Sequence, residues 1–407
     1  MKSVPPNTTG SLEEPGRTID AIGVTRATRI ILLLVMFGGL FDVFEQGAIG
    51  IVGPSLQAAW GLDTTQIGLL STATLGSMVV GGLIGGALGD KFGRKTIFTF
   101  NLAVYSLGGL LCAFSPGLEV LLIGRIIVGF GLGGELSIAL TLLSELTPTK
   151  FRASAVSLFN VGAAGLGNPL AFGVGLLFIS LLGPALGGDQ NSWRWFFGFL
   201  ALPALFILWI RRNLPETPRY LMARGRIEEA NQSLSVLAAG RLNPHKVEYT
   251  EHVKTGSHVT LSEKTRLLDV FRGRLLRNTV TVGLAAWMSF GAQLAVLTLL
   301  PTVLVARGYD ITSSLAFTMV MYIGGFFGTL VASVVNYRLK RRVVVIPAAA
   351  LACAFAVLFG LAQGVAQILI FGAIFQFFVF LLNTTIWAWA PELYRLLGHS
   401  VGVRRAG

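Results

Sequence analysis

Three carboxylic acids lie inside apolar stretches of the sequence, where an ionised side chain is costly. They are Asp42, Glu45 and Glu135. Asp42 and Glu45 are three positions apart and therefore share one face of a helix. Two carboxylates this close in a low dielectric titrate one after the other, so one can bind and release a proton near neutral pH. The pair predicts a proton carrier. The alternative is that one acid only hydrogen-bonds within a bundle or caps a helix break near Gly47 and Gly50.

One cation, Arg125, also lies inside an apolar stretch. Counted from the inner ends of two oppositely directed helices, Arg125 and Glu45 lie at the same depth, roughly 22–24 Å at 1.5 Å per residue. We expect them to meet, so that Arg125 can exchange the acid for a substrate carboxylate; a permanent structural ion pair is the alternative. Glu135 lies about 9 Å from the inner face by the same count. This depth predicts a place at the inner gate or the cavity floor.

Other polar side chains with apolar neighbours are candidate substrate contacts, although each could instead hydrogen-bond to a neighbouring helix. Asn168 precedes Pro169, so a backbone carbonyl freed by the proline could join a binding site. The set comprises Gln46, Asn160, Asn168, Gln293, Gln376, Asn383 and Trp387. We select Gln46, Asn168, Gln293 and Trp387, together with Arg125, as substrate-binding candidates.

Apolar runs long enough to cross a bilayer must position these groups. Hydrophobic residues make up 53% of the 407 residues and charged residues 13%, and the mean hydropathy is +0.70, all outside the soluble range. We predict ten runs of about 20 residues, the length that crosses roughly 30 Å of hydrocarbon. They occupy 30–52, 67–88, 97–115, 118–141, 154–182, 195–210, 279–303, 313–335, 343–363 and 365–390. The fold class is therefore an all-α polytopic membrane protein.

The net charge of +12 follows membrane topology. With a cytoplasmic N-terminus, 29 of the 32 Lys and Arg residues fall in inner segments, 13 of them across 211–277. The positive-inside rule then places both termini in the cytoplasm. We expect the protein to lie in the inner or plasma membrane of the cell. A lipid-headgroup or nucleic-acid role for 211–277 stays open, but its many acids argue against it.

Histidine and cysteine give no sign of an enzyme. All four histidines lie in the linker or the tail, without the spacing of metal ligands or of a nucleophile and its base. Cys112 and Cys353 each lie inside an apolar run, so we expect no disulfide and no metal site.

Two motif pairs repeat at nearly the same interval. Asn336 follows Asp90 by 246 positions, and Glu392 follows Glu145 by 247. A duplicated six-helix half explains this interval. The predicted parts are a disordered cytoplasmic tail (1–29), a six-helix N-terminal bundle (30–212), a cytoplasmic linker (213–277), an incomplete four-helix bundle (278–392) and an aberrant cytoplasmic tail (393–407). The same period would end the second half near residue 458, so we expect two missing spans in a truncated product.

Three segments carry a resemblance to a known family. GALGDKFGRK (86–95) resembles the loop between helices two and three of the major facilitator superfamily. LPETPRYLMARGRIEEA (214–230) is similar to the segment after helix six in its sugar-porter and metabolite:proton branches. FDVFEQGAIGIVGPSL (41–56) resembles the first helix of aromatic-acid:proton and metabolite:proton symporters. The last segment, PELYRLLGHSVG (391–402), departs from the pattern of SELTPTKFRAS (144–154).

The resemblance implies roles for several residues. It makes Glu45 the coupling acid and Asp42 the auxiliary acid, and it places Gln293 and Trp387 on the cavity wall. It also implies a network of charges that holds the inner mouth closed; a solvated surface cluster is the alternative. The network would comprise Asp90, Arg94, Glu145, Arg152, Glu216 and Arg219. Glu135 joins the gating candidates because of its depth, not because of the resemblance. Because Asn336 stands in place of an acid, we expect an asymmetric lock.

These observations predict a secondary transporter that takes up a small organic solute, such as an organic or aromatic acid or a sugar-like metabolite, by proton symport and alternating access. The proton gradient would supply the energy, without a cofactor. The expected partners are the substrate and the lipid bilayer, with no nucleic acid, and the expected state is a monomer. A proton-driven efflux antiporter and a non-transporting fragment or sensor are the alternatives.

Overall fold

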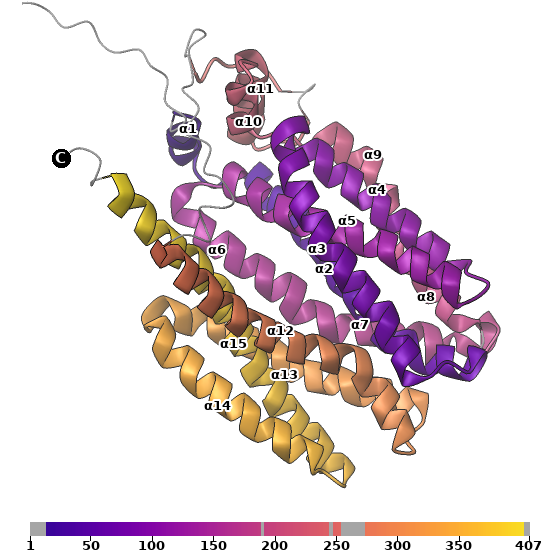
Figure 1. Cartoon of the computed structure of the whole chain (residues 1–407). Helices are drawn as coiled ribbons and strands as arrows, with labels where there is room; N and C mark the ends of the chain where they lie inside the picture. Colours follow the sequence, from indigo (N-terminus) through magenta and orange to yellow (C-terminus); the bar gives the residue numbers. More distant parts are fainter. Residues whose placement is uncertain (1–13, 189–190, 244–246, 254–272, 403–407) are drawn as a thin grey trace, which may run out of the picture. The chain divides into compact units, whose positions relative to one another are not determined.

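The computed structural model describes residues 14–188, 191–243, 247–253 and 273–402. Nearly all of these residues are helical, and the described ranges contain no β-strand (Figure 1). The predicted all-α membrane fold is confirmed.

Nine helical segments within the described ranges are long and apolar enough to cross a membrane. Eight of them are α2 (Arg26–Trp60), α3 (Thr64–Phe92), α4 (Arg94–Ala113), α5 (Leu118–Leu146), α12 (Gly273–Ala306), α13 (Ile311–Arg338), α14 (Arg341–Gly360) and α15 (Val365–Gly402). The ninth, Thr149–Leu181, consists of α6 (Thr149–Asn160) and α7 (Leu166–Leu176) with π-helical turns at Val161–Gly165 and Leu177–Leu181. A short 3₁₀ turn follows at Gly183–Leu186.

The predicted run at 195–210 is interrupted. It forms two shorter helices, α8 (Ser192–Leu200) and α9 (Pro203–Asn213), because Pro203 has no N–H with which to continue the hydrogen-bond ladder of α8. The prediction for the end of α5 is also wrong: the helix ends at Leu146 rather than 141. It stops before Pro148, since a residue that precedes proline is pushed out of the helical region.

Three short helices lie outside the spans: α1 (Glu14–Ile22), α10 (Pro218–Ala223) and α11 (Ile227–Ala239). Helix α1 corrects the prediction of a disordered tail over 1–29, of which residues 1–13 lie outside the described ranges. Helix α1 packs on α11, and its Ile19 is buried. Helix α15 continues to Gly402, well into the predicted tail 393–407.

Contacts divide the chain into two compact units. Unit 1 comprises Met1–Asp42, Leu70–Phe159 and Phe197–Lys264, and unit 2 comprises Val43–Leu69, Asn160–Phe196 and Thr265–Gly407. The division falls within α2 and does not follow the predicted bundle limits, which stay a prediction.

Within unit 1, helices α3 and α5 cross at glycines. A Cβ atom at Gly133 would lie 1.8 Å from the carbonyl oxygen of Met78, and one at Gly129 would lie 2.0 Å from that of Thr74. Only glycine allows the two backbones to approach this closely, a form of packing that membrane helices use because lipid gives them no hydrophobic driving force to associate.

The internal repeat extends to helix boundaries and packing. Helices α12, α13, α14 and α15 each begin 247 positions after α2, α3, α4 and α5, respectively. A Cβ atom added at Gly81 would lie 2.0 Å from the carbonyl oxygen of Phe130, and one added at Gly328 would lie 2.1 Å from that of Phe377. The two glycines are 247 positions apart, and so are the two phenylalanines. This register pairs Asn336 with Gly89, one position away from the match with Asp90 that the motifs predicted.

We expect Gly133→Ala to lower the melting temperature of the detergent-solubilised protein, because the methyl group would meet backbone rather than a movable side chain. Overpacking of this kind costs about 1–3 kcal/mol. Gly86→Ala on α3 is the matched control, since a Cβ atom there meets nothing within 4 Å. Equal melting temperatures for the two variants would contradict the close crossing.

Candidate functional site

The N-terminal end of α4 is capped by a carboxylate from a distant segment. Glu216 accepts hydrogen bonds from the backbone N–H groups of Arg94 at 3.0 Å and Lys95 at 3.1 Å, and from that of Thr217 at 3.0 Å. Gly93 makes room: its φ of 101° is left-handed, and a Cβ atom there would lie 2.3 Å from Glu216 Oε2. A negative charge at a helix N-terminus is favoured by the unpaired N–H groups and the helix dipole.

Arg94 connects this cap to two further acids. Its guanidinium lies 2.8 Å from Asp90 and 3.6 Å from Glu145 of α5, and it donates to the carbonyl oxygen of Gly89 at 3.2 Å. The structure therefore brings together four of the six residues predicted for the inner network, namely Asp90, Arg94, Glu145 and Glu216. They join α3, α4, α5 and the segment before α10.

The other two residues of the predicted network lie elsewhere. Arg152 is close enough to Asp20 of α1 for their charges to interact, and Arg219 is exposed on α10. Asp20 accepts hydrogen bonds from the backbone N–H of Thr149 at 2.6 Å and from its hydroxyl at 2.9 Å, and these bonds lower the pKa of Asp20. No spacing in the sequence connects Asp20 to Thr149, 129 positions away.

Arg224, which the predicted network did not include, lies near Asp90. It donates to the carbonyl oxygen of Lys91 at 2.6 Å and to that of Asp90 at 3.4 Å. Sequence reasoning missed Arg224 because these acceptors are backbone atoms, which leave no pattern of side-chain types.

Burial raises the pKa of the Glu216 carboxyl, although the N–H groups that it accepts from act in the opposite direction. The folded protein therefore binds this proton more tightly than the unfolded chain does. The contribution of Glu216 to stability is present at low pH and is lost as pH rises from the ordinary pKa of glutamate through the raised one.

We expect the melting temperature of the wild type to fall, relative to that of Glu216→Gln, as pH rises from about 4 to about 8. Glutamine keeps an acceptor oxygen and does not titrate. Glu228→Gln on α11 is the control, because Glu228 is exposed. If the two variants respond to pH alike, the Glu216 carboxyl is not the titrating group.

Two of the predicted acids meet inside unit 1. Asp42 of α2 is 3% exposed and Glu135 of α5 is fully buried, and their carboxyl groups are close enough to interact. Gly38, one turn before Asp42, leaves space, since a Cβ atom there would lie 2.6 Å from Glu135 Oε1. Glu135 therefore lies beside Asp42, and its place at the inner gate or the cavity floor stays a prediction. The depth count was short because α5 runs five residues further than predicted.

Arg125 is also buried within unit 1, at 1% exposure. Its Nε donates to the hydroxyl of Thr74 at 3.1 Å, and its guanidinium lies over the ring of Phe197, 5.8 Å from the centroid. Thr74 was not predicted, and no charge pattern marks it. Glu45 is fully buried and belongs to unit 2, so its pairing with Arg125 stays a prediction.

Unit 2 gathers several of the predicted polar residues. Asn383 donates its side-chain N–H to Gln293 and accepts from the hydroxyl of Ser289, which joins α15 to α12. Trp387 lies edge-on to Phe290, with ring centroids 6.3 Å apart, and is 41% exposed. Among the remaining candidates, Asn168 donates to the carbonyl oxygen of Ala164 at 2.9 Å, and Gln46 is half-buried.

A buried tyrosine that sequence reasoning missed lies near Gln376. Tyr322 of α13 stacks on Phe172 with centroids 5.5 Å apart and meets Phe380 edge-on at 5.9 Å. Its hydroxyl lies near the Gln376 side chain, and the polar atoms of both side chains are buried. The sequence feature that could have marked Tyr322 is a tyrosine within an apolar run.

In the part of the chain that the structure describes, no group of three or more His, Cys, Asp or Glu residues could hold a metal ion.

Long apolar helices, buried acids and a charged cluster at helix ends define a multi-span membrane protein of the transporter class. Residues 31–403 match the family described as sugar (and other) transporter, and the chain belongs to this family, part of the major facilitator superfamily. The predicted superfamily is thereby confirmed.

Several known proteins are similar to this chain. A niacin transporter of Acinetobacter baylyi is 30% identical over 366 residues, which cover 89% of this chain and 80% of the relative. A 4-hydroxybenzoate transporter of the same organism is 28% identical, with 77% and 65% covered. The partially occluded inward-open structure of the xylose transporter of Escherichia coli has a TM-score of 0.68 at 20% identity, with 89% and 84% covered. These relatives are transporters, which confirms that the chain is not an enzyme.

Proposed function

We propose that this protein imports a small organic acid by proton symport, with alternating access of the substrate to the two sides of an inner or plasma membrane. The observation that carries the proposal is the meeting of Asp42 and Glu135 inside apolar helices, with Glu45 one turn further along α2. Buried carboxyl groups are expensive in a membrane and mark proton pathways by default.

Neighbouring carboxyl groups suit proton coupling because a proton bound by one removes the repulsion between them, and its release restores that repulsion. Glu45 is the proposed coupling acid and Asp42 the auxiliary acid. The contact of Asp42 with Glu135 offers the proton a further station on α5. No cofactor is required, because the proton gradient supplies the energy.

Arg125 favours an acidic substrate over a neutral one. A buried guanidinium can bind a carboxylate through two parallel hydrogen bonds. The chain's relatives include transporters named for niacin, 4-hydroxybenzoate and gallate, all carboxylic acids, besides transporters named for xylose and glucose. Gln46, Asn168, Gln293 and Trp387 are the proposed further contacts to the substrate.

The charged cluster at the inner ends of α3, α4 and α5 is the proposed lock of the cytoplasmic mouth. Arg94 holds acids from two helices, and Glu216 ties the linker segment to the start of α4. Both termini are proposed to lie in the cytoplasm, and the working unit to be a monomer that partners only its substrate and the bilayer.

Glu45→Gln is expected to abolish proton-driven accumulation but to leave substrate exchange measurable, because exchange requires no net release of a proton. The measurement is uptake of nicotinate and 4-hydroxybenzoate into proteoliposomes with an imposed proton gradient. Glu119→Gln, at an exposed acid of α5, is the control and should accumulate normally. Accumulation by Glu45→Gln at neutral pH would remove Glu45 from the mechanism, and outward movement of substrate under an inward gradient would indicate an antiporter.

Arg125→Ala is expected to reduce uptake of an anionic substrate by about 10- to 100-fold, and Arg125→Lys by less, because loss of a hydrogen bond to a charged group costs about 1.5–3 kcal/mol. Uptake of xylose, which has no carboxylate, is the internal control. Adding Glu45→Gln to Arg125→Ala should cost less than the sum of the single changes if the two side chains meet. Strict additivity would show that they act independently.

A further inference from the structure

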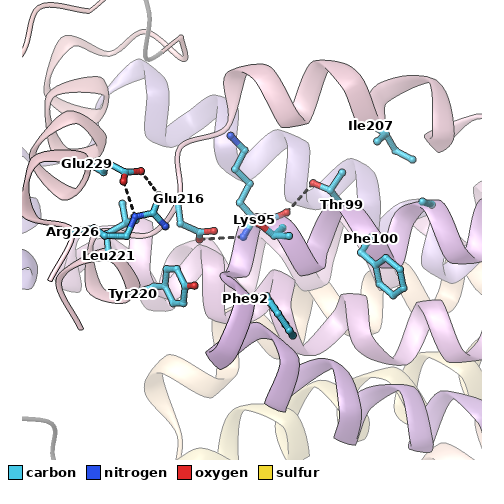
Figure 2. Close-up of a pocket in the computed structure, with 12 residues that line it drawn as sticks. Phe92, Lys95, Thr99, Phe100, Ile207, Glu216, Tyr220, Leu221, Arg226 and Glu229 are labelled. Carbon is cyan, nitrogen blue, oxygen red and sulfur yellow. Dashed lines mark hydrogen bonds and ion pairs between the residues drawn. The ribbon is translucent and has the colours of Figure 1, made fainter. Parts of the chain in front are cut away.

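A pocket of about 590 Å³ lies in unit 1 beside α4, and Asp42, Glu45 and Glu135 are not among its lining residues (Figure 2). We call it the linker pocket, because α10 and α11 of the linker form one of its walls. Its lining residues come from the end of α3, from α4, from α9 and from the linker, and they are Phe92, Lys95, Thr96, Thr99, Phe100, Ala103, Ile207, Glu216, Tyr220, Leu221, Arg226 and Glu229.

The lining changes from polar to apolar along α4. Phe100 and Ala103 lie six and nine residues after the first residue of α4, about 9–14 Å into the span at 1.5 Å per residue. Lys95 and Thr96 lie at its start. Figure 2 shows the same order across the pocket, with Arg226 and Glu229 at one end and Phe100 and Ile207 at the other. One end of the pocket thus lies at the level of the lipid headgroups and the other at the level of the acyl chains.

The apolar end is open to the outside of the unit. Phe100, six residues into α4, is 49% exposed. Because α3 and α4 span the membrane, side chains that remain exposed at this depth meet lipid. The occupant of this end must therefore be a hydrocarbon chain that can approach from the bilayer.

The polar end is suited to a phosphodiester. Lys95 supplies an ammonium group and the exposed Thr96 a hydroxyl group. Arg226 donates to both carboxylate oxygens of Glu229, at 2.6 and 2.5 Å, and Glu216 already accepts three backbone N–H groups. The two acids balance the two cations, so the pocket favours a head with one phosphate over a head of high negative charge.

We propose that the linker pocket binds a phospholipid of the inner leaflet, with its phosphate at Lys95 and Thr96 and one acyl chain against Phe100, Ala103 and Ile207. Such a lipid fastens the linker helices α10 and α11 to the membrane helices α4 and α9. The proposal does not depend on which solute the protein transports.

Native mass spectrometry of the full chain in detergent tests the proposal, with palmitoyl-oleoyl-phosphatidylcholine as the probe. Diacylglycerol with the same chains tests the need for the phosphate, and inorganic phosphate tests whether the phosphate alone suffices. We expect retained phosphatidylcholine, no retained diacylglycerol and no displacement by inorganic phosphate. Retention of diacylglycerol would indicate simple filling of an apolar groove, and displacement by phosphate would indicate a free-anion site; either result overturns the proposal.

Two variants separate the head and the tail of the lipid. Lys95→Ala should weaken phosphatidylcholine binding about tenfold, as expected for loss of one charge-assisted hydrogen bond, and Lys95→Arg should restore it. Ala103→Trp should block the apolar end and reduce retention with Lys95 intact. Arg342→Ala is the matched control, since Arg342 is exposed at the start of α14, 247 positions after Lys95. If both Lys95→Ala and Ala103→Trp bind phosphatidylcholine as the wild type does, the site is refuted. If one of the two variants folds poorly, the other variant alone decides the result.

Discussion

The approach of two helix backbones at glycine determines where the buried charges of unit 1 lie. Gly129 and Gly133 let α5 touch the carbonyl groups of α3, and Arg125 lies one turn before this contact. The guanidinium therefore meets Thr74, whose own carbonyl oxygen faces Gly129. Gly38 has the same effect on α2, where it makes space for Glu135 beside Asp42. In a membrane, where apolar side chains gain little by leaving lipid, such contacts replace the hydrophobic core as the source of fixed geometry.

The two halves of the repeat agree in packing and differ in charge. The 247-residue register pairs Gly81 with Gly328, and it pairs Asp63 with Asp310, acids that accept from backbone N–H groups in the first turns of α3 and α13. The buried charges have no ionisable counterparts. Asp42, Glu45, Arg125 and Glu135 correspond to Ser289, Ala292, Gly372 and Leu382. Helix boundaries and crossings are thus common to both repeats, whereas these four buried ionisable residues of the first repeat are replaced by non-ionisable residues at the matching positions of the second.

Hydropathy and short spacings predicted much of the molecule. Nine of the ten runs are long helices, since about 20 apolar residues can hardly form anything else in lipid. The cluster of Asp90, Arg94, Glu145 and Glu216 was predicted because its members lie at helix ends in marked motifs. The contacts of Asp42 with Glu135 and of Arg125 with Thr74 were missed, because they depend on how distant helices cross. An error of five residues at the end of α5 also moved Glu135 by about 7 Å in the depth count.

The cap on α4 has a consequence for the order of events during synthesis. The carboxylate of Glu216 lies 122 positions after the N–H group of Arg94 that it caps. At about 5–20 residues per second, translation needs roughly 6–24 s to cover that distance. Throughout this interval α3 and α4 are already available for insertion, while the first turn of α4 has only water or lipid headgroups to accept its N–H groups. The Glu216 cap can therefore form only after α9 has been made, so the ribosome completes the membrane helices of unit 1 before this cap on α4 closes.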